Sequence, residues 1–205
     1  MPRQEPGLKW SRALPYDLGV HGQVNAAKGT ITLHLHNPGR AGAVFRVSDA
    51  RSPDAPRNYT VEAGKHLHDT WLAAADGRYD LVVSGPGGFH RRFAGDVTHA
   101  RVVGAEAHVR HETDAQGALR LVIENRGSLT LVVVVRPNAY TKQAPRRHAL
   151  RPGAVVDDHW DVAESLGWYD LSVTVEGDAT FVRRAAGRVE TGRPSVSDPA
   201  TLTQE

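Results

Sequence analysis

Two pairs of histidines have the spacing closest to that of a metal site: His34 with His36, and His66 with His68. Side chains two positions apart in a β-strand point to the same face. Each pair would therefore present two imidazoles together, which suits a divalent metal. The chain repeats itself, and the second copy has other residues at these positions, namely Val122, Glu124, Val155 and Asp157. We therefore favour a solvated polar strand face over a metal site in one copy, and expect no metal.

A short acidic run, Asp157-Asp158-His159, has side chains suited to binding Ca²⁺ or relaying protons. Asp158 matches Asp69 of the first copy, and aspartate often bonds the backbone of a turn. We therefore interpret both as turn or backbone-capping residues. The sequence contains no Gly-x-Ser-x-Gly elbow, Walker A loop, His-Glu-x-x-His motif or EF-hand loop. It predicts no catalytic residue and no cofactor in this chain.

Trp71 and Trp160 are the third candidate, because aromatic rings bind quaternary ammonium groups such as choline. An aromatic cage needs two or three rings that converge. Each copy offers one matched Trp and one matched Tyr, Tyr79 or Tyr169, so burial in a core is the simpler interpretation. Trp71 and Trp160 remain the candidate ligand residues.

An internal repeat must position all of these residues. Residues 77–83, Gly-Arg-Tyr-Asp-Leu-Val-Val, return at 167–173 as Gly-Trp-Tyr-Asp-Leu-Ser-Val. Other matches keep the same order, and their offset grows only from 88 to 92, as small loop insertions would produce. They include 27–37 with 115–125, Pro56-Arg57 with Pro145-Arg146, and the Phe-x-Arg-Arg segments at 89–92 and 181–184. The unit is too long for a solenoid repeat and has the length of a small β-sandwich, so we predict two homologous domains.

The pattern within each unit is that of β-strands. Isoleucine and leucine alternate with threonine and histidine over 31–36, which is typical of a half-buried strand. About seven such strands with regular turn signals are typical of an immunoglobulin-like sandwich. The sequence thus predicts an all-β protein of two tandem immunoglobulin-like β-sandwich domains. In such sandwiches a Tyr near the start of the sixth strand closes a corner through its hydroxyl, and we assign this structural role to Tyr79 and Tyr169.

The repeat and the composition define the domains and exclude several partners. We expect a linker or leading segment at 1–12, sandwiches at 13–98 and 99–189, and a polar tail at 190–205. The chain has no Cys and a net charge of +2 with scattered basic residues, so we expect no disulfides, thiolate metal sites or nucleic-acid partner. No apolar run approaches the ~20 residues of a membrane span. Residues 1–6 lack the apolar segment of a signal peptide, so an exported parent would contain this chain as a piece.

Residues 131–135, Leu-Val-Val-Val-Val, are apolar on both faces of a strand. Such a strand needs cover on both sides. Either its outer face meets the first domain or an absent partner, or the sheet's own loops close it.

Several motifs together resemble those of a known family: Leu14-Pro15-Tyr16, the repeated Gly-x-Tyr-Asp-Leu-x-Val motif, and the run from Gly85 to Gly95. Over roughly 12–189 the chain resembles the C-terminal region of bacterial phosphocholine-preferring phospholipases C. The resemblance implies a large phosphatase-like catalytic domain upstream, followed by two copies of a small β domain. It implies a parent that hydrolyses phosphatidylcholine or sphingomyelin to phosphocholine and a diglyceride or ceramide, and that is secreted or periplasmic. The family's catalytic residues lie upstream, so none transfers to this chain.

We therefore expect a non-catalytic accessory region that supports an upstream phospholipase C catalytic domain, or its engagement with a phosphatidylcholine membrane surface. One alternative is a phospholipid- or choline-binding module. The other is a purely structural interdomain scaffold, which predicts that Val134→Lys loosens the docking of the domains.

Overall fold

Strands form in both repeats where apolar and polar residues alternate. The computed structural model describes residues 7–102, 107–113 and 118–199, with side chains over 7–99 and 118–199. The strands of the first repeat are β2 (Gly19–Asn25), β3 (Thr30–Asn37), β4 (Ala43–Asp49), β5 (Arg57–Val61), β6 (Lys65–Leu72), β7 (Arg78–Ser84) and β8 (His90–Asp96). Those of the second are β9 (Ala107–Thr113), β10 (Leu119–Asn125), β11 (Leu131–Ala139), β12 (Arg146–Leu150), β13 (Val155–Trp160), β14 (Trp168–Val175) and β15 (Asp178–Arg188).

Each repeat folds into a sandwich of a three-stranded and a four-stranded sheet. In the first, β2-β3-β6 packs on β8-β7-β4-β5, and in the second, β13-β10-β9 packs on β12-β11-β14-β15. The alternating apolar residues face inward and form one core per sandwich, centred on Leu33 and Phe45 in the first and on Leu121 and Leu171 in the second. Each fully buried side chain of this size stabilises the fold by about 1.5–3 kcal/mol. The predicted all-β fold of two tandem immunoglobulin-like sandwiches is confirmed.

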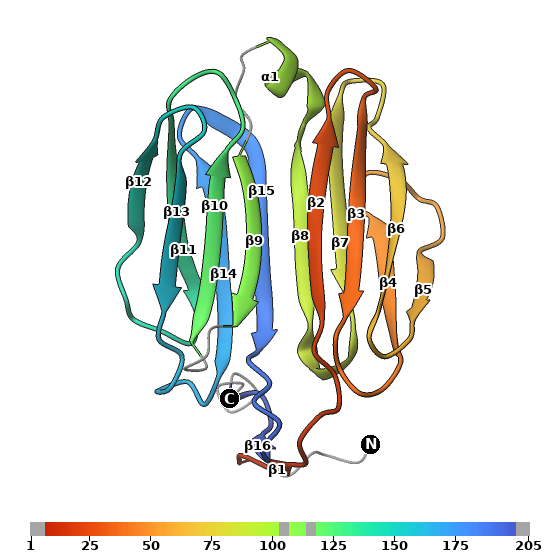
Figure 1. Cartoon of the computed structure of the whole chain (residues 1–205), viewed down its shortest axis with the longest axis vertical. Helices are drawn as coiled ribbons and strands as arrows, with labels where there is room; N and C mark the ends of the chain where they lie inside the picture. Colours follow the sequence, from red (N-terminus) through yellow and green to blue (C-terminus); the bar gives the residue numbers. More distant parts are fainter. Residues whose placement is uncertain (1–6, 103–106, 114–117, 200–205) are drawn as a thin grey trace.

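The two sandwiches share one continuous sheet, because β8 of the first pairs with β15 of the second (Figure 1). The pairing is antiparallel and runs from His90 opposite Ala186 to Ala94 opposite Val182. Its midpoint is Arg92 opposite Arg184, which are matched residues of the two repeats. The junction therefore has an approximate twofold axis between these two arginines.

The apolar strand at 131–135 lies away from this junction. It belongs to β11, and β14 and β15 separate β11 from β8. The prediction that its outer face meets the first domain is therefore wrong. Val134 is half-buried, and its cross-strand neighbours are Arg147 and Thr174.

The ends of the described chain meet below the sandwiches (Figure 1). β1 (Trp10–Ser11) pairs with β16 (Ser195–Val196), so part of the expected linker and part of the expected tail form one small ribbon. Trp168 donates its indole N–H to the carbonyl of Val196 at 3.3 Å. A short helix, α1 (Val97–Val102), follows β8, and a 3₁₀ turn, η1 (Pro86–Gly88), lies between β7 and β8.

Candidate functional site

At the junction, each repeat inserts an arginine into the other repeat. Arg183 of β15 donates to the hydroxyl of Tyr79 at 2.6 Å and to the carbonyl of Ala94 at 2.6 Å. Arg91 of β8 donates to the hydroxyl of Tyr169 at 2.8 Å and to the carbonyl of Ala186 at 3.0 Å. Both arginines are only 3% exposed. The first arginine of each Phe-x-Arg-Arg segment thus binds the tyrosine of the opposite repeat.

The second arginine of each segment stays within its own repeat. Arg92 holds Asp80 through two hydrogen bonds of 2.7 and 2.6 Å, and Arg184 holds Asp170 through two of 2.8 and 2.5 Å. Arg92 and Arg184 face each other across the twofold axis. Each carboxylate compensates the like charge that the pairing of β8 with β15 brings together.

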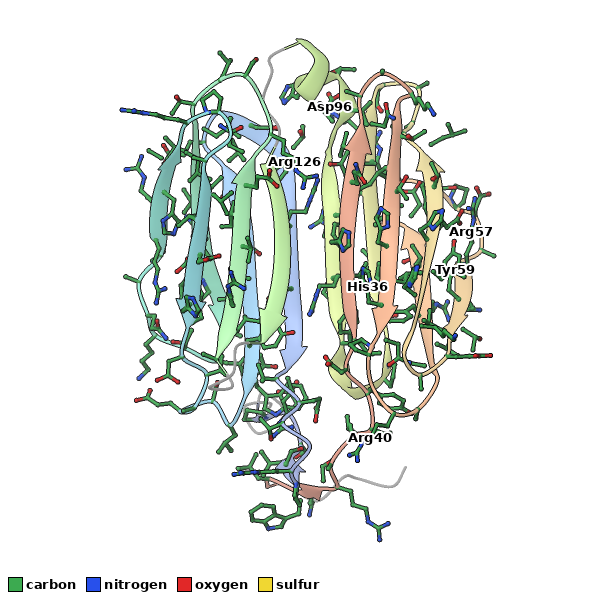
Figure 2. All side chains as sticks on the ribbon, viewed as in Figure 1. His36, Arg40, Arg57, Tyr59, Asp96 and Arg126 are labelled. Carbon is green, nitrogen blue, oxygen red and sulfur yellow. The ribbon has the colours of Figure 1, made fainter. Side chains whose placement is uncertain are left out.

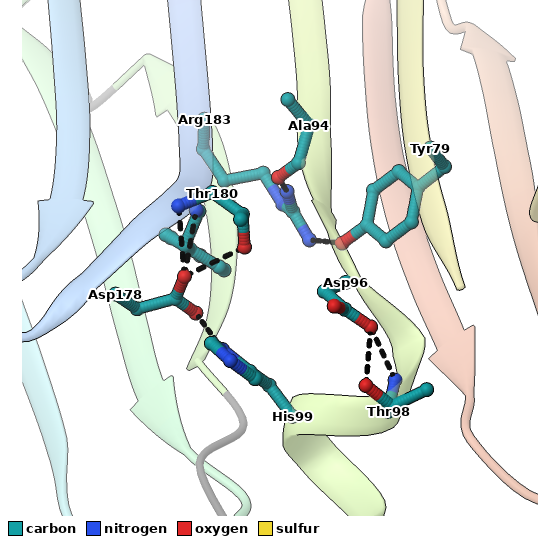
Figure 3. A network of polar contacts seen from close by, with 9 residues as sticks. Tyr79, Ala94, Asp96, Thr98, His99, Asp178, Thr180 and Arg183 are labelled. Carbon is teal, nitrogen blue, oxygen red and sulfur yellow. Dashed lines mark hydrogen bonds and ion pairs between the residues drawn. The ribbon is translucent and has the colours of Figure 1, made fainter. Parts of the chain in front are cut away.

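Figure 3 shows the end of the junction near α1. His99 of α1 contacts Asp178 at 2.9 Å, and Thr180 donates to the same carboxylate at 2.6 Å. The hydrogen bond to Asp178 raises the pKa of His99. Burial opposes ionisation of Asp178, but its bonds with Thr180 and His99 lower its pKa. The contact between His99 and Asp178 therefore fastens the connection between the repeats to β15.

A cavity of about 430 Å³ opens near the other end of the junction. Its wall combines apolar and aromatic side chains, such as Tyr16, Phe89 and Leu119, with charged and polar ones. Arg188 and Glu190 lie on the same wall and form an ion pair of 3.0 Å. Burial raises the pKa of Glu190. Residues of both repeats line this cavity, so it exists only because the sandwiches are joined.

The two candidate ligand tryptophans each have one face covered by an arginine. The guanidinium of Arg57 lies 4.0 Å from the ring of Trp71, and that of Arg146 lies 4.1 Å from Trp160. Trp160 is 1% exposed and Trp71 9%. The protein's own cations thus occupy the position that a choline group would take. Figure 2 labels Arg57 at the edge of the first sandwich.

The matched aspartates hold these arginines in place. Asp158 accepts bonds from Arg146, from His148 at 3.1 Å and from the indole of Trp160 at 3.1 Å. Asp69 binds Arg57 at 3.0 Å, and it also accepts a bond of 2.5 Å from Tyr59 and one of 2.8 Å from the Thr70 amide. Both aspartates lie in strands, β6 and β13, so the turn role predicted for them is wrong, whereas Asp69 does bond a backbone amide, that of Thr70. Period-two alternation turns them toward the facing sheet of the sandwich, whose edge strands β5 and β12 carry Arg57 and Arg146.

The run at 157–159 does not converge on one site. Asp157 pairs with Arg120 at 2.9 Å on the outer face of the sheet, whereas Asp158 is buried. Among the residues with described side chains, no three His, Cys, Asp or Glu are arranged to hold a metal ion. The charged side chains instead pair with one another at the junction and at the edges of the sheets.

Comparison with known proteins explains the repeated architecture. The family described as "Bacterial phospholipase C, C-terminal domain" matches the chain twice, over residues 10–96 and 100–188. The chain belongs to this family. The two matches correspond to the two sandwiches, and the gap between them falls in the segment that begins with α1.

Relatives of this phospholipase C family are considerably longer than the chain. A non-hemolytic phospholipase C of Burkholderia pseudomallei is 45% identical over 205 residues, which cover 99% of this chain and 29% of that protein. A non-hemolytic phospholipase C of Pseudomonas aeruginosa is 39% identical, and the match covers 97% of this chain and 29% of that protein. A hemolytic phospholipase C of the same organism is 39% identical, and the match covers 97% of this chain and 30% of that protein. The chain therefore spans less than a third of these relatives and matches their C-terminal part.

In the described part of this phospholipase C C-terminal region, no helix has the length and apolarity required to cross a bilayer.

Proposed function

We propose that this chain is a non-catalytic accessory region of a bacterial phospholipase C. The rest of the parent enzyme would hydrolyse phosphatidylcholine or sphingomyelin, and the whole would be secreted or periplasmic. In this proposal the two fused sandwiches support the upstream catalytic domain or help it to engage the membrane.

The observation that carries the proposal is how the charged side chains are used. The buried arginines bind tyrosine hydroxyls and carbonyls across the junction, and their neighbours bind carboxylates within a repeat. A hydrolytic site needs a nucleophile and a base held within hydrogen-bond reach at a cavity. The arginines of the junction instead fix the relative position of two domains, as an accessory region requires.

Two assays test the accessory role. The chain alone should show no turnover of a chromogenic phosphocholine diester, whereas the full-length parent should. A parent truncated before this region should lose activity on phosphatidylcholine vesicles, or should be recovered in lower soluble yield. The control is a full-length parent with Gly42→Ala in this region, which should lose less of either. Turnover of the diester by the chain alone would overturn the proposal.

A second candidate is a phospholipid- or choline-binding module, and the junction cavity favours it. Three aromatic residues, Tyr16, Phe89 and Tyr169, and the carboxylate of Glu190 line one space of about 430 Å³. Rings together with a carboxylate can hold a quaternary ammonium group. Calorimetric titration with choline and phosphocholine tests this candidate. Binding that Tyr16→Ala abolishes and His159→Gln preserves would support it, and no heat from either ligand would exclude it.

A further inference from the structure

Five imidazoles gather on the outer face of the sheet β2-β3-β6. The sheet register places His21 opposite His34, His34 opposite His68, and His36 opposite His66. These side chains lie on the face opposite to that of Leu33 and Leu35, which point into the core. Figure 2 labels His36 on this face, in front of the larger sheet. We call the five residues the histidine face.

The rings are close enough to repel one another once charged. The ring centroids of His21 and His34 are 4.7 Å apart, and those of His21 and His36 are 5.0 Å apart. The cross-strand pairs His34–His68 and His36–His66 are at 5.8 and 6.4 Å. Burial first, and then the neighbouring histidines, lower the pKa of His34 and of His36. Both causes favour the neutral form of these two rings.

Carboxylates are absent from this face of the three strands. Residues of the same alternation, all of them described, are Gly19, Gln23, Asn25, Thr30, Thr32, Thr70 and Leu72. Ionisable groups at the margins are Tyr16, Asp17, Arg91, Arg188 and Glu190 of the cavity that His21 and His36 also line. Strand β9 runs beside β2 and has His108, Arg110, His111 and Glu112 in its sequence. Of the two carboxylates among these marginal groups, Asp17 and Glu190, the second forms an ion pair with Arg188.

The second repeat provides an internal comparison. At the positions of His34, His36, His66 and His68 it has Val122, Glu124, Val155 and Asp157. Two of these are already in ion pairs, Asp157 with Arg120 at 2.9 Å and Glu124 with Arg126 at 2.8 Å. The equivalent face of the second repeat thus combines both signs of charge. The cluster of five histidines is therefore a property of the first repeat.

We propose that the histidine face binds anionic lipid bilayers at acidic pH and releases them at neutral pH. Imidazole is the side chain whose protonation falls in this range, and the positive charge that a cluster of five imidazoles can take up in acid is opposite to the charge of an anionic bilayer. The negative surface potential of such a bilayer attracts each nearby cation. This goes beyond the accessory role, because it assigns a surface, a ligand class and a trigger that do not depend on which enzyme the chain belongs to.

Vesicle co-sedimentation of the chain tests the proposal. The vesicles are phosphatidylcholine alone, or phosphatidylcholine with phosphatidylglycerol, at about pH 5 and about pH 7.5, on either side of the ordinary imidazole pKa. We expect binding only to the anionic vesicles, only at the lower pH, and weaker at high salt. Binding to phosphatidylcholine alone at both pH values would instead support the choline-binding module and overturn the histidine face.

Two variants locate the binding surface. His66→Gln with His68→Gln removes two exposed cations, and because each contributes about fivefold near an anionic bilayer, binding at the lower pH should weaken by up to ~30-fold. His159→Gln, an exposed histidine on β13 of the second repeat, is the matched control and should bind like the wild type. Equal binding by the double variant and the control would refute the proposal.

A fixed-charge variant separates surface charge from unfolding in acid. His66→Lys with His68→Lys carries two permanent cations at exposed positions. It should bind anionic vesicles at about pH 7.5, where the wild type does not and where the fold is not stressed by acid. A lysine variant that stays in the supernatant at neutral pH, with a native near-ultraviolet circular dichroism spectrum, would overturn the proposal.

Discussion

Tyr79→Phe removes one hydroxyl from the junction and nothing else. The hydroxyl accepts a bond of 2.6 Å from Arg183, and the two residues are 5% and 3% exposed. A hydrogen bond to a charged group contributes about 1.5–3 kcal/mol, and water has little access to screen this one. Arg183 keeps its bond of 2.6 Å to the carbonyl of Ala94. We therefore expect the free energy of unfolding to fall by about 2 kcal/mol.

Urea denaturation followed by tryptophan fluorescence measures this loss, since both repeats contain a tryptophan in or near their core. Arg183→Met supplies the double-mutant cycle. If the bond is the origin of the effect, Tyr79→Phe should cost much less in the Arg183→Met background, with a coupling of about 1–2 kcal/mol. A loss below about 0.5 kcal/mol, or strict additivity of the two changes, would show that the Arg–Tyr bond does not stabilise the junction.

Two further predictions follow from packing and titration. Gly95→Ala would place a Cβ 2.5 Å from the Tyr79 hydroxyl, so we expect a loss of about 1–3 kcal/mol in the free energy of unfolding; the control Gly42→Ala meets nothing nearer than 3.8 Å and should be nearly neutral. Because the folded state lowers the pKa of His34 and His36, the unfolded chain binds protons first as the pH falls below about 6.5. Stability from this source is complete above that pH and is lost below it. Melting temperatures should therefore fall less between about pH 7.5 and 5.5 when both residues are Gln, and equal slopes would contradict the assignment.

The sequence predicted the sandwiches but not the way in which they join. Period-two alternation shows which face of a strand is buried, and the ordered matches show that the unit occurs twice. Neither shows which edge strand pairs with which, because edge pairing uses backbone groups that all residues share. One signal was present but not used: Arg91 lies in phase with Phe89 and Phe93, so the alternation puts a charge on the core side of β8. A buried arginine needs a hydrogen-bond acceptor, and the tyrosine that recurs in both repeats, Tyr79 or Tyr169, could have been proposed as that acceptor.

The arginine contacts of the two tryptophans also could not be read from the sequence pattern. Trp71 and Trp160 were matched by the repeat, and so were Arg57 and Arg146, but only the packing of one sheet on the other shows that each arginine lies on its tryptophan. Recurrence of an arginine, an aspartate and a tryptophan in both units was the available signal for this network. Their ligand role stays a prediction, which the covered ring faces argue against.

His21 was missed for a related reason. It has no histidine two positions away, so the pair spacing that drew attention to the other four did not apply to it. Its place in the cluster depends on the pairing of β2 with β3, which puts its ring nitrogen 3.2 Å from that of His36. Cross-strand neighbours of this kind follow from register, and register is set by the whole sheet.

The symmetry of the β8–β15 pairing bears on the origin of the chain. Each repeat carries both halves of the contact, the arginine that is inserted and the tyrosine that receives it, and an interface of this kind is isologous, as in twofold homodimers. The duplicated chain thus has the architecture of a dimer whose subunits became covalently linked after gene duplication. Once linked, the two halves could diverge in sequence, and the histidine face is present in the first half alone. A segment of residues 13–98 made by itself should therefore self-associate through β8, and light scattering after size exclusion would show twice the mass of one repeat. A strictly monomeric repeat would argue that the sandwiches first met as neighbours within one chain.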